Sequence, residues 1–251
     1  MIKFNEVIIS KEPRAGCKDL WNAHMVEGAI FSEHDIPLCP TFLPNGLPKA
    51  LISYEKAKTI FKAEVEKGIN YHDAFIHFCI DDQKFDSVTD GIWYYPEKFL
   101  KIAKHFAGII TPDFSTYLDF PDPIKRNNTY RMRAFGYWCY SQGIPTINNV
   151  RWGCEDTWEY CFDGIPSNSV VFIGTIASGI RQKAYREIFV KGIRQLAEIL
   201  SPKVYIIYGS QRDPVFDELR KAGAEIIHFE SETNQFFKNR SFLYTINRSG
   251  A

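Results

Sequence analysis

Short apolar runs alternate along the chain with longer segments in which apolar residues recur every three or four positions. The pattern is clearest near the C-terminus, where residues 181–200 predict a helix because Lys and Arg separate the recurring apolar residues. Pro202 ends this helix, and residues 204–208 form a β-branched and aromatic run of strand length. A short helix over 214–222 and a strand over 225–229 complete a β-α-β unit.

The same alternation of strands and helices continues upstream of this unit. We expect about six strands with helices between them, which predicts a mainly parallel sheet with right-handed crossovers. The expected helices span residues 54–67, 96–106 and about 126–142, and the expected strands are 74–80, one from Gly108, 145–151 and 169–176, with a further one near 36–39 or 50–53.

The number of these β-α units decides the predicted fold. Seven or eight units in about 250 residues match the size of a barrel of parallel strands. We therefore predict one α/β domain over residues 1–251, most simply a TIM-barrel-like (β/α) barrel. The alternative is an open doubly wound parallel sheet, although the chain lacks the glycine signatures of nucleotide binding in such sheets. Residues 1–35 and 231–251 are expected to be irregular or edge elements, with an edge element around 242–246.

Composition and charge exclude several classes of protein. Hydrophobic residues make up 45% of the chain and aromatic residues 15%, which is ample for a large core. Thirty basic residues balance thirty acidic ones, so no global charge favours nucleic acid or an anionic membrane surface. The N-terminal run contains Lys3 and Glu6 and lacks the apolar core of a secretory signal, and no segment approaches the roughly 18 apolar residues of a membrane span. We expect a soluble, cytoplasmic protein.

The cysteines predict neither disulfides nor a zinc site. None of the six forms a Cys-x-x-Cys pair, and the chain has no His-Glu-x-x-His motif. Cys79 and His77 are two residues apart in an expected strand, which places both on one face. We expect reduced cysteines that are mostly buried as small apolar residues.

Polar side chains follow the expected strands at the points where those strands end. Parallel α/β folds bind ligands at the carboxyl ends of their strands, because the loops converge there. The stretch from Gly108 shows the pattern, since a buried strand is followed by Asp113, Tyr117 and Asp119. Acids, an arginine and aromatic residues at these ends are typical of a polar-substrate pocket, although solvated loops use the same residue types. The candidate site residues are Asp81, Asp113, Tyr117, Arg151, Trp152, Glu155, Thr175, Tyr208 and Ser210.

The residue types suggest a role for each candidate. Asp113 and Glu155 follow neighbouring strands, so the two carboxylates could act as proton donor and acceptor or share a divalent cation. Tyr117 is a hydrogen-bonding acid. Arg151 suits an anionic group and Trp152 offers a stacking face. A divalent metal therefore remains open, and no other cofactor is indicated. The remaining candidates are assigned to ligand binding: Asp81, Thr175, Tyr208 and Ser210.

Two basic segments raise the question of nucleic acid. Residues 126–140 combine Arg126, Arg131 and Arg133 with Tyr and Trp side chains that could stack on bases. At helical spacing, however, their aromatic residues share one face, and we favour packing against the sheet. The helix over 181–200 is also rich in basic residues, which predicts a solvated outer face and makes it the best candidate for a phosphate-facing or partner-facing patch.

Four sequence motifs carry a family resemblance. They are GIITPDFS at 108–115, QGIP at 142–145, VRWG at 150–153 and YCFDGIP at 160–166. On these motifs the chain resembles an uncharacterised family of proteins carried by bacteria and by their phages and plasmids. The resemblance spans roughly residues 100–210. It implies a phage or mobile-element setting, with a role in host–phage conflict or element maintenance, and it implies no activity.

Three functional hypotheses follow from these observations. The first is a hydrolase or lyase that acts on a small polar or phosphorylated, nucleotide-like compound through Asp113, Glu155 and Arg151, with Tyr117 or Tyr208 as an acid. The second is a binding protein that sequesters a nucleotide-like signal or a host factor. The third is a nucleic-acid-processing or replication-associated protein, which the neutral net charge disfavours. We favour the first, because carboxylates near strand ends are more numerous than binding alone requires.

Overall fold

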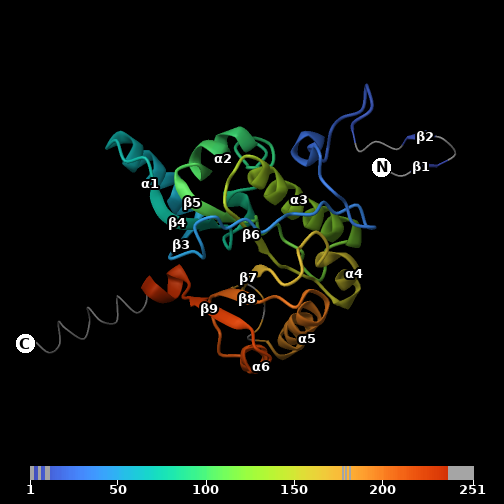
Figure 1. Ribbon diagram of the computed structural model, residues 1–251, viewed down its shortest axis with the longest axis vertical. Coiled ribbons are helices and arrows are strands. Elements are labelled where there is room, and N and C mark those ends of the chain that lie inside the picture. The colour runs from blue at the N-terminus through green and yellow to red at the C-terminus, as the bar shows by residue number, and fades with distance from the viewer. Residues whose placement is uncertain are drawn as a thin grey trace, which may run out of the picture.

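A sheet of seven parallel strands forms the centre of the protein (Figure 1). The computed structural model describes residues 12–176, 178, 180 and 182–236, and the backbone of two short antiparallel strands, β1 (Lys3–Phe4) and β2 (Val7–Ile8). The strands of the sheet, in their order across it, are β3 (Leu51–Ser53), β4 (His72–His77), β5 (Phe106–Ile110), β6 (Thr146–Asn149), β7 (Val170–Gly174), β8 (Val204–Tyr208) and β9 (Glu225–Phe229). Every neighbouring pair is parallel, and the strand order follows the chain without a reversal.

One α-helix lies in each connection between consecutive strands of the sheet. The helices are α1 (Tyr54–Glu66), α2 (Pro96–Ala103), α3 (Asp122–Ser141), α4 (Trp158–Cys161), α5 (Lys183–Leu200) and α6 (Val215–Lys221). This alternation confirms the predicted α/β fold with a parallel sheet. Within the described part of the chain, no helix is long and apolar enough to cross a membrane.

The two faces of the sheet bury different sets of side chains. Along β8, Tyr205 and Ile207 pack with residues of α5 and α6, whereas Ile206 and Tyr208 belong to a separate inner cluster. Successive residues of a strand point to opposite faces, so this alternation is the expected outcome of strand geometry. The inner cluster draws on β4 to β8 and includes Phe75 and Phe172. The helices therefore cover the outer face, and the inner face packs its own side chains.

The sheet curls into a half-barrel that stays open, so the prediction of a closed TIM-barrel-like barrel is wrong. Strands β3 and β9 are the two edges and do not pair with each other. The carboxylate of Glu232, just after β9, instead accepts hydrogen bonds from the backbone N–H and the hydroxyl of Ser53 at 3.1 and 3.3 Å. Of the two places considered for a further strand, residues 51–53 form one and 36–39 do not. Within the described residues the sheet thus has seven strands and two unclosed edges, as in the predicted alternative of an open parallel sheet.

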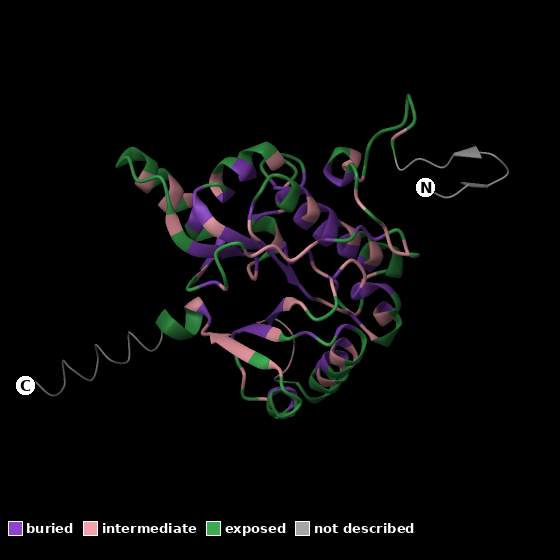
Figure 2. Cartoon of the chain, in the orientation of Figure 1, coloured by how far each residue is buried: buried purple, intermediate pink, exposed green. Residues whose placement is uncertain are grey.

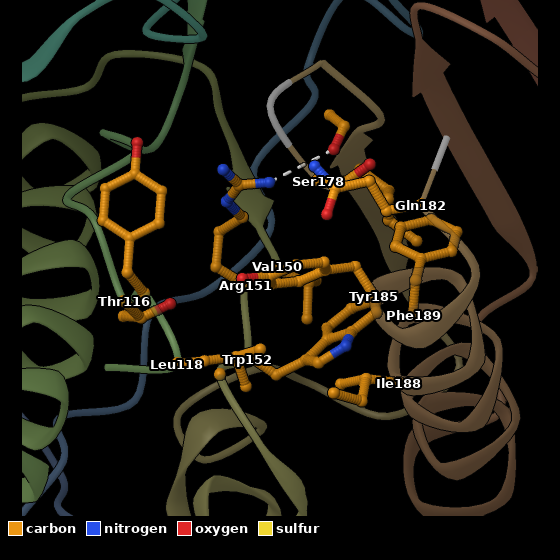
Figure 3. A pocket seen from close by; sticks show the side chains of 14 residues that line it. Thr116, Leu118, Val150, Arg151, Trp152, Ser178, Gln182, Tyr185, Ile188 and Phe189 are labelled. Atoms are coloured by element: carbon orange, nitrogen blue, oxygen red, sulfur yellow. Dashed lines mark hydrogen bonds between the residues drawn. The ribbon is translucent and has the colours of Figure 1, made fainter. Parts of the chain in front are cut away.

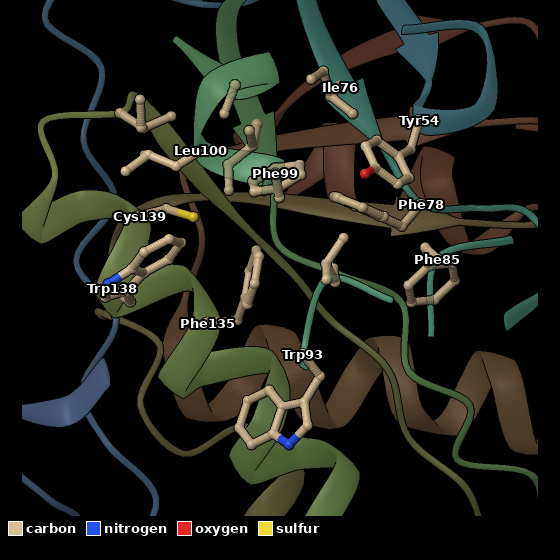
Figure 4. Packing of buried hydrophobic residues seen from close by; sticks show 14 of the residues in the cluster. Tyr54, Ile76, Phe78, Phe85, Trp93, Phe99, Leu100, Phe135, Trp138 and Cys139 are labelled. Carbon is tan, nitrogen blue, oxygen red and sulfur yellow. The ribbon is translucent and has the colours of Figure 1, made fainter. Parts of the chain in front are cut away.

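The largest core lies between the sheet and helices α1 to α3 and is rich in aromatic side chains (Figure 4). Phe99 of α2 lies with its ring centre 5.5 Å from that of Tyr54 and 5.2 Å from that of Phe135 of α3. Such tilted aromatic pairs combine a large buried area with favourable ring geometry. Burial is concentrated in the strands and in the inward faces of the helices (Figure 2).

Helix α3 buries two of its three arginines inside the protein. Arg133 is fully buried and donates hydrogen bonds to the backbone oxygens of Asn149, Cys161 and Asp163 at 2.9 to 3.2 Å. Arg131 is paired with a carboxylate, that of Asp86. The predicted packing of this segment is confirmed for Ala134 and Trp138, which are buried in the largest core, and Tyr130 packs against the same core. Residues 242–246, considered as an edge element, lie outside the described residues.

Candidate functional site

A cavity of about 260 Å³ opens at the carboxyl ends of the strands (Figure 3). One wall comes from the loop after β5, the base from the residues that follow β6, and the opposite wall from α5 and the segment before it. Arg151 lies between the two walls, and its guanidinium group extends towards the Ser178 side. The lining residues are Thr116, Tyr117, Leu118, Val150, Arg151, Trp152, Gly153, Ile173, Gly174, Ser178, Gln182, Tyr185, Ile188 and Phe189.

Two internal contacts hold the Arg151 side chain in place. Its Nε lies 2.8 Å from Oδ1 of Asp113, and its Nη1 donates a hydrogen bond to the backbone oxygen of Gly174 at 3.3 Å. Burial lowers the pKa of Arg151, but the charge of Asp113, together with smaller contributions from Cys79, Tyr117 and Asp82, outweighs this effect, and the pKa lies above its ordinary value. Arg151 therefore remains a cation. Its Nη2 has no hydrogen-bond partner within the described residues, which leaves donors available to a ligand.

A layer of buried polar groups beneath the cavity supports this ion pair. The side-chain amide of Asn149 donates to Oδ1 of Asp113 at 2.8 Å. The backbone of Asn149 is fixed in turn, because its N–H donates to Oγ1 of Thr111 at 2.8 Å and its oxygen accepts from Arg133 at 2.9 Å. The ion pair is thus built on the rigid end of β6. Such support locks the rotamers of a site before a ligand arrives.

Cys79 and Asp82, which follow β4, belong to the same polar layer. Burial, and after it the charge of Asp113, raises the pKa of the Cys79 thiol well above its usual value, so this thiol stays neutral near pH 7. Asp82 accepts hydrogen bonds from the hydroxyl and the backbone N–H of Ser115 at 2.9 and 3.2 Å. Burial raises the pKa of Asp82 above its ordinary value even though these bonds oppose the shift.

Aromatic side chains make up much of the cavity wall. Trp152 packs against Phe189 of α5 with ring centres 5.5 Å apart, and a Cβ atom added at Gly192 would lie 2.2 Å from the indole nitrogen. The absence of a side chain at Gly192 therefore allows Trp152 to occupy its position. Tyr117 and Tyr185 line the cavity and are 48% and 43% exposed. A ligand between these walls would cover aromatic surface that now faces solvent.

The structure brings four of the predicted site residues together. Asp113 and Arg151 form the buried ion pair, and Arg151, Trp152 and Tyr117 line the cavity. Their convergence follows from the curl of the sheet, which directs the ends of β5, β6 and β7 to one place (Figure 1).

The other predicted residues lie elsewhere. Glu155 begins a 3₁₀ turn on the outer surface, where its carboxylate lies 2.5 Å from Nζ of Lys191, so it is not brought together with Asp113. Asp81 is exposed and does not line the cavity. Oγ1 of Thr175 accepts the backbone N–H of Ser210 at 2.6 Å, which ties the ends of β7 and β8 together. Tyr208 is buried on the inner face of the sheet.

Some residues of the site were not predicted from the sequence. Asn149, in the polar layer beneath the cavity, is inside a strand, Gln182 lies directly before α5, and Tyr185 belongs to α5. The period-two pattern of β6 could have indicated Asn149 as a site residue, because Ile147, Asn149 and Arg151 are two positions apart and therefore share one face of the strand. The prediction that Cys79 and His77 share a face agrees with their placement, since His77 contacts Tyr208 and Cys79 packs against the same inner cluster.

Three basic residues of α5, Arg186, Lys191 and Arg194, form ion pairs on the outer surface. Arg186 pairs with Asp213 at 2.5 Å, and Arg194 pairs with Glu218 at 2.8 Å. These contacts partly neutralise the surface considered for a phosphate or a partner. Among the described residues, no group of three or more His, Cys, Asp or Glu side chains is placed to hold a metal ion.

The fold and the cavity define an α/β half-barrel protein with a small pocket at the carboxyl ends of its strands. The chain matches the family described as Domain of unknown function (DUF4417) over residues 33–230 and belongs to that family. It is 36% identical over 138 residues to the Gene 1 protein of Mycobacterium phage L5, which covers 55% of this chain and 58% of that protein. It is 35% identical over 138 residues to the Gene 1 protein of Mycobacterium phage D29, and the matched region is 55% of this chain and 49% of that protein.

The chain therefore spans about half the length of these curated relatives. The resemblance to an uncharacterised, phage-associated family is confirmed. No solved structure matches the chain.

Proposed function

We propose that this protein binds a small polar or phosphorylated compound in the cavity beside Arg151. The proposal is carried by the position of the Arg151 guanidinium group. Asp113 and the backbone oxygen of Gly174 hold two of its nitrogens, while its remaining N–H donors border the cavity. An arginine held in this way loses little side-chain freedom when it binds a ligand. The buried layer under it, with Asn149 and Arg133, adds to this pre-organisation.

The test is a thermal-shift screen against nucleosides, nucleotides, cyclic and linear dinucleotides, sugar phosphates and divalent metals. The screen is run on the parent protein, on Arg151→Lys and on Arg194→Lys. The Arg194 variant is the matched control, because that arginine is also ion-paired but lies on the outer surface of α5. We expect a compound that stabilises the parent and Arg194→Lys and has a clearly smaller effect on Arg151→Lys. Equal stabilisation of all three proteins would contradict binding at this cavity.

A second candidate function is catalysis, as a hydrolase or lyase that acts on the bound compound. The supporting observation is that Asp82, whose pKa is raised by burial, lies in the same polar layer as Asp113, while Tyr117 lines the cavity. Carboxyl groups in different environments can divide the roles of acid and base. Glu155 has no part in this proposal, because its carboxylate pairs with Lys191 on the outer surface.

Catalysis is tested on any compound that the screen identifies. The reaction mixture is followed by mass spectrometry for the parent, Tyr117→Phe and Asp82→Asn. A catalytic role predicts product from the parent, and at least tenfold less from one of the variants at unchanged binding. Binding without any product would assign the protein to the non-catalytic class.

A further inference from the structure

We infer that the cavity selects an uncharged, planar heterocycle of nucleobase size and that Asp113 makes it discriminate against phosphorylated forms of the same compound. The inference rests on the proposed function, because it names the class of compound that the proposed cavity binds.

The charge balance around Arg151 disfavours an anionic ligand. Its guanidinium group already has a carboxylate partner, with Nε 2.8 Å from Oδ1 of Asp113. Asp82 belongs to the same polar layer and adds a second carboxyl group. A phosphate at the free edge of Arg151 would therefore bring its charge close to Asp113 in a partly buried place, where like charges repel strongly. A neutral acceptor, such as a ring carbonyl, receives the same hydrogen bond without that repulsion.

The composition of the cavity lining favours an uncharged ligand with both donors and acceptors. Arg151 is the one charged side chain among the described lining residues. The other polar side chains are neutral, and Ser178 and Gln182 lie on the side towards which the guanidinium group extends (Figure 3). Hydroxyl and amide groups can donate and accept, which suits the mixed edge of a heterocycle.

The shape of the site favours a flat ring system. The exposed rings of Tyr117, in the loop after β5, and Tyr185, in α5, belong to opposite walls. Trp152 lies at the base beside Ile188 (Figure 3). Aromatic surfaces of this kind stack on flat rings regardless of their exact substituents. The volume of about 260 Å³ lies below the about 300–1,000 Å³ typical of pockets for drug-sized ligands. A single ring system with a small substituent fits such a space better than a dinucleotide does.

The test measures dissociation constants by isothermal titration calorimetry. The ligands are adenosine, guanosine, cytidine and uridine, each compared with its 5′-monophosphate. We expect at least one nucleoside to bind the parent protein, and its monophosphate to bind at least about tenfold more weakly. The variant Asp113→Asn keeps an oxygen for Arg151 and Asn149 but removes the charge. In this variant, the ratio of the monophosphate's dissociation constant to that of the nucleoside should fall towards one or below it.

Each other result has a defined meaning. Tighter binding of the monophosphates to the parent, or a ratio that Asp113→Asn leaves unchanged, overturns the inference while the proposed function stands. No binding of any of the eight compounds overturns the inference, and the wider thermal-shift screen then decides the proposed function separately. If Asp113→Asn does not fold, Asp82→Asn removes the second carboxyl group of the same layer, and an unchanged ratio in that variant overturns the inference.

Discussion

His77 should make the protein less stable as the pH falls from about 6.5 to about 4, and replacement of His77 by Phe should remove that dependence. The imidazole is fully buried on the inner face of β4, with its ring centre 4.2 Å from that of Tyr208. Its Nδ1 accepts the backbone N–H of Cys79 at 3.2 Å, and its Nε2 has no partner among the described residues. The native state therefore holds a neutral ring in a place that disfavours the imidazolium ion.

The pKa of His77 sets the size of the effect. Burial lowers it from 6.5 to about 4, while the charge of Glu232 partly opposes the shift and that of Lys56 adds to it. Below about pH 6.5 the unfolded chain binds a proton that the folded protein does not bind until about pH 4, so the free energy of unfolding rises with pH across this window. At about 1.4 kcal/mol for each pH unit, the loss relative to pH 7.5 is about 2 kcal/mol at pH 5 and about 3 kcal/mol at pH 4.

Urea unfolding of the parent and of His77→Phe at pH values from 4.5 to 7.5 measures this effect. Other titrating groups are shared by the two proteins and cancel in the difference between their free energies of unfolding. The Phe variant leaves the N–H of Cys79 without its acceptor, which costs about the same at every pH. We expect the parent to lose about 2 kcal/mol more than the variant between pH 7.5 and pH 5. Parallel curves would refute the assignment of a neutral, buried His77.

Three further predictions concern packing and charge. Arg151→Met should cost about 3–5 kcal/mol in urea unfolding because it leaves the Asp113 carboxylate buried and unpaired, and the double variant with Asp113→Leu should recover much of that loss. Gly108→Ala should cost about 1–3 kcal/mol, because its Cβ would lie 2.5 Å from the ring of Phe75. Calorimetry of Glu155→Gln should show unchanged affinity for any compound bound at the cavity, since the ion pair that the substitution breaks is exposed. A large loss of affinity would show that Glu155 takes part in binding.

The order of elements was readable from the sequence because each element has a strong local pattern. The runs at 204–208 and 225–229 form strands with those bounds, since continuous β-branched and aromatic residues favour extended backbone. The first is buried on both faces, and the second is the half-buried edge strand β9. The helix expected at about 126–142 begins earlier, at Asp122, because Pro123 is accepted in the first turn of a helix. Barrel closure was not readable, since it depends on whether the two edge strands meet and no local pattern reports that.

The site was only partly readable for a similar reason. The sequence shows which residues follow a strand, and this was enough for Asp113 and Arg151. It does not show how the chain turns afterwards, so Glu155 appeared to be a partner of Asp113, although the chain carries it to the outer surface. Tyr185 joins the cavity only through the packing of α5 beside the end of β6, which is a tertiary contact that sequence spacing does not encode.

NMR tests most directly whether the cavity beside Arg151 is the ligand site. Titration of ¹⁵N-labelled protein with the eight nucleosides and monophosphates follows the side-chain signals of Arg151 Nε–H and Trp152 Nε1–H. We predict that a binding compound shifts both signals and the backbone amide of Tyr185, while the side-chain signal of Arg194 on the outer surface stays unchanged. Shifts confined to the surface around Arg194, with Arg151 and Trp152 unaffected, would contradict the account.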